Sequence, residues 1–302
     1  MLRRVLITGA AGFIGRHVAR EFAKRGWYVI GVGFGEWDKY GLYGLSEWYC
    51  CKITVDALIK YAGKVDIIIH CAGGGLVANS YAEPYQDFSK TVDTTAQVLE
   101  FIRLHSPKTR FFYPSSAAVY GSADKLPIAE DTPLKPISPY GFHKKMAESI
   151  CELYAENFGV SVVIFRLFSI YGNGLRKQLL WDACRKFKES GNIFFGTGDE
   201  VRDLLHVEDV AKLFLTLSLE SINTFTVLNA GFGQGVSVKN ILFHINELLA
   251  LDLEPQFSLV PKIGDPKGYI SDNTKVSSFN WAPTINWQKG VTDYVKWYKQ
   301  CL

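Results

Sequence analysis

The sequence predicts an α/β fold, in which a doubly wound parallel sheet is followed by a smaller, partly interwoven C-terminal lobe. Two observations lead to this prediction. Over the first half of the chain, short β-branched runs alternate with helical patterns, which is typical of βαβ units. Beyond about Phe168 the segments become shorter and glycine clusters interrupt them. The 302 residues, 48% of them hydrophobic, are sufficient for both parts.

The strands of the first part are predicted from short apolar runs bounded by glycine or polar residues. In chain order they are Val5–Thr8, Trp27–Val32, Asp66–His70, Arg110–Tyr113 and Val162–Phe165, the last of which closes the series. Apolar residues at helical spacing predict helices over Phe13–Lys24, over about Asp87–Leu104 and from near Pro139. We therefore assign residues 1–167 to a first domain.

The second part, residues 168–302, is expected to form a lobe rather than an independent domain. Its helical patterns lie at Leu175–Glu189, Val207–Leu219, Val238–Leu249 and Gln288–Lys299. Some of its segments are expected to return to the first domain, because the two parts share no obvious linker.

Composition and charge exclude several classes of function. The formal net charge is +3 and no basic stripe is present, so we expect no nucleic-acid partner. No apolar run reaches the roughly 20 residues of a membrane helix, so we expect no membrane association. The six cysteines are scattered, with no C-x-x-C pair or histidine cluster beside them. This pattern indicates reduced thiols in a cytoplasmic protein and no metal site.

A glycine loop follows the first predicted strand and opens the first predicted helix. Gly9, Gly12 and Gly15 are spaced as G-x-x-G-x-x-G. The first glycine permits a tight turn, the second lets the backbone approach a pyrophosphate, and the third allows close packing of helix on strand. The helix N-terminus offers unpaired N–H groups to the phosphates. This placement favours a dinucleotide site over an ordinary turn.

The end of the second predicted strand leaves the kind of dinucleotide open. Gly33 occupies the position where an acidic residue would hold the adenosine ribose hydroxyls. Glu36 and Asp38 follow closely and could take over this role, whereas Lys39 is the nearest cation for a 2′-phosphate. Both NAD and NADP are compatible with these residues, and NAD is slightly favoured.

A second group of residues can move a proton. Tyr140 and Lys144 lie four residues apart on the helix that starts at Pro139, so they share one face. The pKa of a free phenol is about 10, and a neighbouring ammonium favours the phenolate that an acid/base needs. Ser116 follows the strand at Arg110–Tyr113, at the sheet edge where ligands bind, and can hydrogen-bond the reacting oxygen. The alternative role of this serine is to cap a turn.

Together these residues resemble the extended short-chain dehydrogenase/reductase family, and within it the NAD-dependent epimerase/dehydratase branch. The resemblance covers essentially the whole chain. Beyond the glycine loop and the Ser-Tyr-Lys set, it rests on Val119-Tyr120-Gly121, Arg166-Leu167-Phe168 and Arg202–Val210. It implies a Rossmann domain that holds NAD or NADP, a C-terminal lobe that holds a nucleotide-diphosphate sugar, and a homodimer.

The resemblance also implies roles for individual residues. Tyr140 would be the acid/base, Ser116 its partner and Lys144 the group that tunes it. The dinucleotide would contact Gly9, Gly12, Phe13, Ile14, Gly15, Cys71, Ala72, Gly73, Tyr140, Lys144 and Phe168. The substrate would contact Ser80, Ser115, Ser116, Ser169, Arg202 and Lys262.

Arg202 matches the family arginine that clamps the substrate diphosphate, a role suited to a planar cation with several donors. A structural salt bridge with Asp203 or Asp199 is the alternative. Lys262 lies where many relatives place a second such arginine, and it would act as a point charge.

Several positions depart from the family pattern. Ala117 and Ala118 replace the Asp-Glu pair of sugar 4,6-dehydratases, so we exclude dehydration. Gly75 stands where some 4-epimerases carry a lysine. Further departures are Ser169 and Thr91 in place of asparagines, and Lys52 in place of an aspartate near the adenine.

These observations predict an enzyme that transfers a hydride at a sugar carbon of a nucleotide-linked sugar, with C4 favoured. A 4-epimerase is the first choice and a 4-ketoreductase of a nucleotide-linked hexose the second, which Gly33 and Gly75 favour mildly. A dinucleotide sensor would not need Ser116, Tyr140 and Lys144, and a reductase of apolar carbonyl compounds would not need Arg202. The nucleobase and the sugar stay open.

Overall fold

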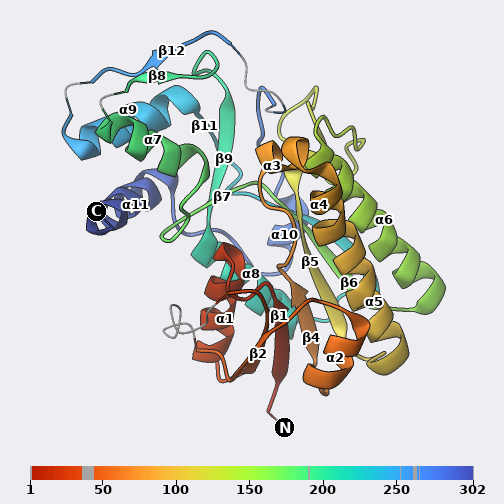
Figure 1. Cartoon of the computed structure of the whole chain (residues 1–302). Helices are drawn as coiled ribbons and strands as arrows, with labels where there is room; N and C mark the ends of the chain where they lie inside the picture. The colour runs from red at the N-terminus through yellow and green to blue at the C-terminus, as the bar shows by residue number, and fades with distance from the viewer. Residues whose placement is uncertain are drawn as a thin grey trace.

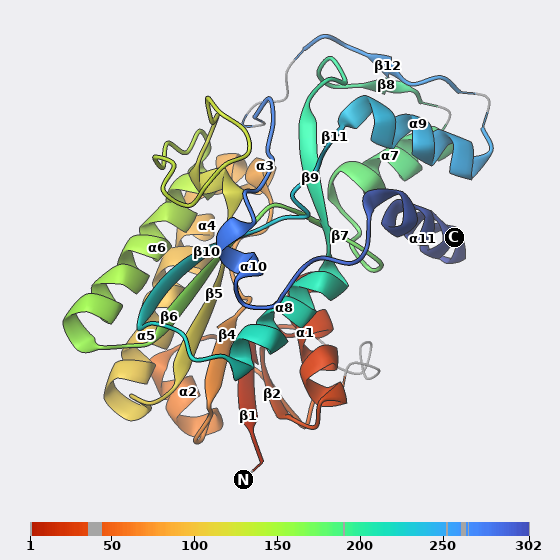
Figure 2. The ribbon, with the colours of Figure 1, turned by 180° about the vertical axis from the view of Figure 1, so that it is seen from behind.

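The computed structural model describes residues 2–35, 44–189, 191–251, 253–260, 264 and 266–301. A seven-stranded sheet with the order β10-β6-β5-β4-β1-β2-β3 forms its centre, and each neighbouring pair is parallel. Helices cover both faces of this sheet, and a smaller lobe lies beyond the end of the sheet opposite to the amino terminus (Figures 1 and 2). The predicted doubly wound α/β fold is thereby confirmed.

The sheet contains all the predicted strands and two more. Its members are β1 (Arg4–Thr8), β2 (Tyr28–Gly33), β3 (Glu47–Cys50), β4 (Ile67–His70), β5 (Arg110–Ser116), β6 (Val162–Leu167) and β10 (Phe225–Ala230). Val162–Phe165 closes the series of predicted strands, but it does not form the edge of the sheet, because β10 pairs with β6 on its outer side. Strand β3 at the opposite edge is half-exposed and lacks the continuous apolar run of a buried strand.

Two layers of helices bury the faces of the sheet. On one face α1 (Phe13–Lys24) packs against α8 (Val207–Leu219), and Phe22 and Phe214 enter the same apolar cluster as Phe112 and Phe165. On the other face lie α2 (Val55–Tyr61), α5 (Thr94–His105) and α6 (Pro139–Phe158). Burial of each large apolar side chain contributes roughly 1.5–3 kcal/mol, so these layers hold the strand ends firmly.

The predicted long helix over Asp87–Leu104 is divided in the structure. A π-helical turn at Ser89–Asp93 separates α4 (Pro84–Phe88) from α5, and α3 (Val77–Ala82) precedes them. Such turns insert an extra residue into the helical ladder and often occur at functional sites. Here the turn contains Thr91, whose hydroxyl accepts the N–H of Gly74 at 3.0 Å.

The smaller lobe has its own sheets and core. Its elements are β7 (Ser169–Tyr171), α7 (Gln178–Lys188), β8 (Ile193–Phe194), β9 (Val201–His206), β11 (Gly235–Ser237), α9 (Val238–Leu249), β12 (Gln256–Phe257) and α11 (Trp287–Gln300). The short helix α10 (Thr274–Ser277) instead packs on β10 of the main sheet. Strands β11, β9 and β7 form one sheet, and α7, α9 and α11 share an apolar cluster. The boundary between residues 167 and 168 stays a prediction, because α8 and β10 pack on the first part of the chain. Within the described residues, no helix is long and apolar enough to cross a bilayer.

Candidate active site

Three adjacent strands bring the predicted residues to one edge of the sheet. Strands β1, β4 and β5 are neighbours, and they end at Thr8, His70 and Ser116. Because the strands are parallel, the segments that follow them meet at this edge. The segments are the glycine loop, the Cys71–Gly75 stretch and the short 3₁₀ turn at Ala117–Val119.

The glycine loop is folded so tightly that side chains would not fit at two of its positions. Gly9 has a φ of +65°, and a Cβ there would lie 2.7 Å from the backbone nitrogen of Ala72. A Cβ at Gly15 would collide with the carbonyl oxygen of Gly9. The first glycine therefore permits the turn and the third permits close packing, as predicted.

The start of α1 fits the phosphates of a dinucleotide. Its N-cap is Gly12, so the first N–H groups of the helix receive no side-chain cap. Its first turn also has no acidic residue that would repel an anion. Unpaired N–H groups at a helix N-terminus bind phosphate oxygens directly. Phe13 and Ile14, in this first turn, lie where the prediction places cofactor contacts.

The Cys71–Gly75 stretch connects the glycine loop to the predicted proton-transfer group. The N–H of Ala72 donates to Thr8 Oγ1 at 3.3 Å, which fixes the stretch to the end of β1. A Cβ added at Gly73 would lie 3.9 Å from Lys144 Nζ. Burial raises the pKa of Cys71 to about 12, so its thiol stays protonated.

The first turn of α6 positions Tyr140. Ser138 is the N-cap of this helix, and its hydroxyl accepts the N–H of Gly141 at 3.2 Å. Ser80 accepts the N–H of Tyr140 at 3.0 Å and donates to the carbonyl oxygen of Val77 at 2.7 Å. Ser80 is fully buried and its hydroxyl is occupied. This geometry favours a positioning role over the predicted contact between Ser80 and substrate.

Tyr140 and Ser116 meet in the structure. A hydrogen bond with Ser116 lowers the pKa of Tyr140, but burial is the larger effect and raises it, and the Asp87 carboxylate raises it further. Ser116 also accepts the N–H of Ala118 at 3.2 Å. Ser116 therefore caps the 3₁₀ turn and also contacts the phenol, and its predicted hydrogen bond to the reacting oxygen stays a prediction.

Lys144 is buried one turn further along α6. Its ammonium donates to the carbonyl oxygen of Pro114 at 2.8 Å and lies 4.8 Å from the centre of the Tyr113 ring. Desolvation lowers the pKa of Lys144 to about 8. The predicted tuning of Tyr140 by this lysine stays a prediction, because Pro114 and Tyr113, which the amine contacts, both lie on β5.

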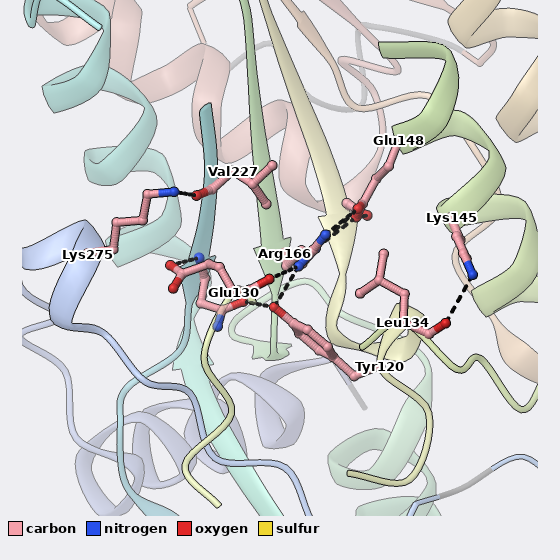
Figure 3. Close-up of polar contacts among 10 residues, drawn as sticks. Tyr120, Glu130, Leu134, Lys145, Glu148, Arg166, Val227 and Lys275 are labelled. Carbon is pink, nitrogen blue, oxygen red and sulfur yellow. Dashed lines mark hydrogen bonds and ion pairs between the residues drawn. The ribbon is translucent and has the colours of Figure 1, made fainter. Parts of the chain in front are cut away.

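Ser115 belongs to a buried ionic network next to the site. Its hydroxyl hydrogen-bonds Glu148, which pairs with Arg166 at 2.8 Å (Figure 3). Arg166 also donates to the hydroxyl of Tyr120 and to the carbonyl oxygen of Glu130, at 2.9 and 2.8 Å. With its hydroxyl occupied, Ser115 fits a structural role better than the predicted contact with substrate.

Two buried residues near the reaction centre escaped the sequence analysis. Asp87 Oδ2 lies 2.6 Å from His143 Nδ1, and both side chains are largely buried. The Asp87 carboxylate acts on the pKa of Tyr140 and of Lys144, raising both. A signal was present, because His143 lies one turn after Tyr140 and on the same face of α6.

The predicted substrate contacts in the smaller lobe are only partly described. Arg202 donates to the carbonyl oxygens of Val201 and Pro266 at 3.0 and 3.1 Å. Asp203 is fully buried and accepts the N–H groups of Phe232, Gly233 and Ser271, so it serves the backbone rather than Arg202. Lys262, Glu36, Asp38 and Lys39 lie outside the described residues.

Phe168 and Ser169 lie where β6 continues into β7. Phe168 is buried and packs edge-on against Tyr269, with 6.0 Å between the ring centres. Ser169 is half-exposed and pairs with Leu204 across β7 and β9. At the other end of the site, a Cβ at Gly33 would lie 3.4 Å from Gly9, so β2 approaches the glycine loop closely.

Comparison with known proteins agrees with this geometry. The sequence profile of the NAD dependent epimerase/dehydratase family matches residues 5–231. A putative UDP-glucose 4-epimerase of Methanocaldococcus jannaschii is 29% identical over 304 residues, which cover 98% of each chain.

Solved structures match along the whole length. A UDP-glucose 4-epimerase from Thermotoga maritima, solved with UDP-glucose, has a TM-score of 0.89 and 26% identity, over 99% of each chain. MoeE5, solved with UDP-glucuronic acid and NAD, has a TM-score of 0.88 and 26% identity, over 99% of this chain and 100% of its own.

Proposed function

The chain belongs to the NAD-dependent epimerase/dehydratase family, and we propose that it is a UDP-sugar 4-epimerase that keeps its NAD bound. The contact between Ser116 and Tyr140, next to the glycine loop and the buried Lys144, carries this proposal. It places a proton donor and acceptor at the sheet edge where the dinucleotide binds in this fold. Relatives that are 4-epimerases over their full length support C4 as the reacting carbon.

The cofactor would be held mainly by backbone. Gly9, Gly12, Phe13, Ile14 and Gly15 would bind its pyrophosphate at the start of α1. The nicotinamide side would face the Cys71–Gly73 stretch, Phe168, Tyr140 and Lys144. When bound, NAD supplies a hydride acceptor that returns the hydride to the same sugar carbon.

Tyr140 would move the proton that accompanies each hydride transfer. Its phenolic oxygen accepts the proton of the sugar hydroxyl during oxidation and returns it during reduction. Ser116 hydrogen-bonds the same sugar oxygen and shares the proton with Tyr140. The buried Lys144 would hold ribose hydroxyls and favour the phenolate.

The substrate would lie between the sheet edge and the smaller lobe. Arg202 and Lys262 would bind the diphosphate, and Ser116 and Ser169 would contact the sugar. The UDP-sugars bound by the Thermotoga protein and by MoeE5 support uridine as the nucleoside.

Tyr140→Phe tests the proposed function, because it removes the proton-transferring oxygen and little else. We expect turnover of UDP-hexoses to fall by at least about a hundredfold, with binding of UDP-sugar nearly unchanged. Interconversion is followed by chromatography of the UDP-sugars, and binding by calorimetry. Retained turnover in the variant would contradict the mechanism.

The dinucleotide released from the purified protein separates the epimerase from the ketoreductase. Stoichiometric NAD, with no net change in nicotinamide absorbance during sugar conversion, is the expected result. Protein without bound dinucleotide that oxidises NADPH only with a 4-keto sugar nucleotide would identify a ketoreductase instead.

We also propose a cytoplasmic homodimer that associates through α5 and α6. Phe142, Met146 and Leu153 form an apolar stripe on α6, and each is about half exposed. Leu104, at the end of α5, is 51% exposed. Association would cover this apolar surface, and the six unpaired thiols favour a reducing compartment.

A further inference from the structure

Lys177 extends from the smaller lobe to the sheet edge that carries the candidate active site. It is the N-cap residue of α7, and its amine donates to the carbonyl oxygen of Gly75 at 3.4 Å. Gln178 donates to the same oxygen at 3.3 Å. A Cβ added at Gly75 would lie only 2.9 Å from Lys177 Nζ, so the amine occupies the space that a side chain at position 75 would need.

Within the part of the chain that the structure describes, the amine of Lys177 has no carboxylate as a partner. Burial lowers its pKa, and within the described residues no carboxylate lies close enough to offset this effect. The first turn of α7 contains no acidic residue, so the helix N-terminus adds positive potential. Gln178 has a φ of +67°, a strained conformation for a residue other than glycine. Among the described residues, the positive charge of Lys177 is thus partly desolvated and has no carboxylate to offset it.

The neighbouring cation does not share this arrangement. Arg176 is exposed, and its guanidinium lies 5.9 Å from the ring centres of both Trp181 and Trp297 in the smaller lobe. Only Lys177 of this pair contacts the Cys71–Gly75 stretch.

Lys177 belongs to the reacting end of the site. Gly73 approaches Lys144, and Gly75 approaches Lys177, so one short stretch lies between the two amines. Arg202 lies elsewhere, on β9, where it donates to the carbonyl oxygens of Val201 and Pro266. With Arg202 holding the diphosphate, as proposed above, a ligand that presents its sugar to Ser116 and Tyr140 would have Lys177 beside its sugar, because the Cys71–Gly75 stretch contacts both this amine and Lys144.

We propose that Lys177 is a specificity-determining residue that binds a carboxylate on the sugar, so that the substrate is a nucleotide-linked uronic acid. This inference rests on the proposed function and names the substrate class of the same site. A charge-assisted hydrogen bond from a partly desolvated ammonium discriminates a carboxylate from a hydroxymethyl group. The diphosphate, common to all nucleotide sugars, cannot supply that discrimination.

The test compares UDP-glucuronic acid with UDP-glucose on the full chain. We expect the wild type to favour the acid by at least roughly tenfold, both in the dissociation constant and in kcat/KM. Lys177→Met should lose this preference, because it should weaken the binding and turnover of UDP-glucuronic acid alone. The dissociation constant and kcat/KM for UDP-glucose should change by less than about twofold. Lys177→Arg should retain it. Lys188→Met, which removes an exposed lysine from the same helix, is the matched control and should behave as wild type.

Three results would contradict the proposals in different ways. If Lys177→Met weakened the binding of UDP-glucuronic acid, UDP-glucose and UDP equally, the amine would contact the diphosphate. That result would overturn the inference. A wild type that prefers UDP-glucose would overturn it as well. Failure of the folded wild type to bind either UDP-sugar would overturn the proposed function itself. Circular dichroism of each variant shows that the comparison is made on folded protein.

Discussion

Burial acts on the two titrating groups of the reaction centre so that each favours its neutral form. The pKa of Lys144 falls to about 8, while that of Tyr140 rises. With a pKa of about 8, Lys144 is still mostly an ammonium near pH 7, whereas the raised pKa of Tyr140 keeps the phenol protonated. The site therefore depends on Ser116, and on ligands that change its solvation, to bring Tyr140 into the phenolate form.

The depressed pKa of Lys144 predicts a specific pH dependence of stability. Between its folded value of about 8 and its ordinary value of 10.5, the unfolded chain binds more protons than the folded chain. The free energy of unfolding should therefore rise with pH through this window. Lys144→Met should lack this rise and should be more stable near pH 7 by about 1–3 kcal/mol.

Urea unfolding at several pH values between 7 and 10.5 measures this effect. Lys145→Met is the matched control, because Lys145 is less buried and donates to the carbonyl oxygen of Leu134 at 3.0 Å. A pH dependence that persists unchanged in Lys144→Met would show that another group causes it.

Single residues also mark how far the sequence predicts the site. Ser115 and Ser116 both follow a strand at the correct edge, and side chains in a strand alternate between faces. The alternation shows that the two serine side chains point to opposite faces of the sheet. Because both faces are buried, it does not show which serine contacts Tyr140. The structure decides between them through Glu148, which accepts a hydrogen bond from the hydroxyl of Ser115.

At the scale of elements, α6 links local sequence to chemistry. Its start is specified by Ser138 as N-cap and Pro139 in the first turn, and the same turn carries Tyr140. Ser138→Ala should reduce the free energy of unfolding by about 1 kcal/mol and should also lower kcat, because the first turn frays. Ser149→Ala, an exposed position on the same helix, should change neither quantity.

Calorimetric unfolding and initial rates, measured on both serine variants, check this prediction. Unaltered stability in Ser138→Ala would mean that Ser80, which holds the N–H of Tyr140, suffices to fix the turn.

Elements with strong periodicity are predicted well, and those that depend on tertiary contacts are not. Helices α1 and α8 have the predicted bounds, since each presents a regular apolar face. The π turn at Ser89–Asp93 interrupts a pattern that remains helical in sequence, and only its contact with Gly74 explains it. In strand β10 polar residues (Thr226 and Asn229) interrupt the apolar run, so its sequence does not reveal that it joins a sheet formed by the first half of the chain.

At the scale of the whole molecule, the two parts are joined by more than one type of contact. Helix α8 and strand β10 return to the main sheet, and Arg16 of α1 donates to the carbonyl oxygen of Gly174 at 2.6 Å. These connections explain why the sequence predicts an interwoven lobe more readily than a boundary. They also place Lys177 and Lys144, from different parts of the chain, on either side of the Cys71–Gly75 stretch.

Helix α6 further connects catalysis to assembly, because its inner face carries Tyr140 and Lys144 and its outer face carries the apolar stripe. Met146 and Leu153 on this stripe are 46% and 50% exposed. Met146→Lys combined with Leu153→Lys should place charge in the proposed dimer interface and yield a monomer in sedimentation experiments. Leu219→Lys, at the exposed end of α8, should leave the mass unchanged. A folded double variant that sediments as the wild-type dimer would show that α6 lies outside the interface, and a monomeric wild type would contradict dimerisation altogether.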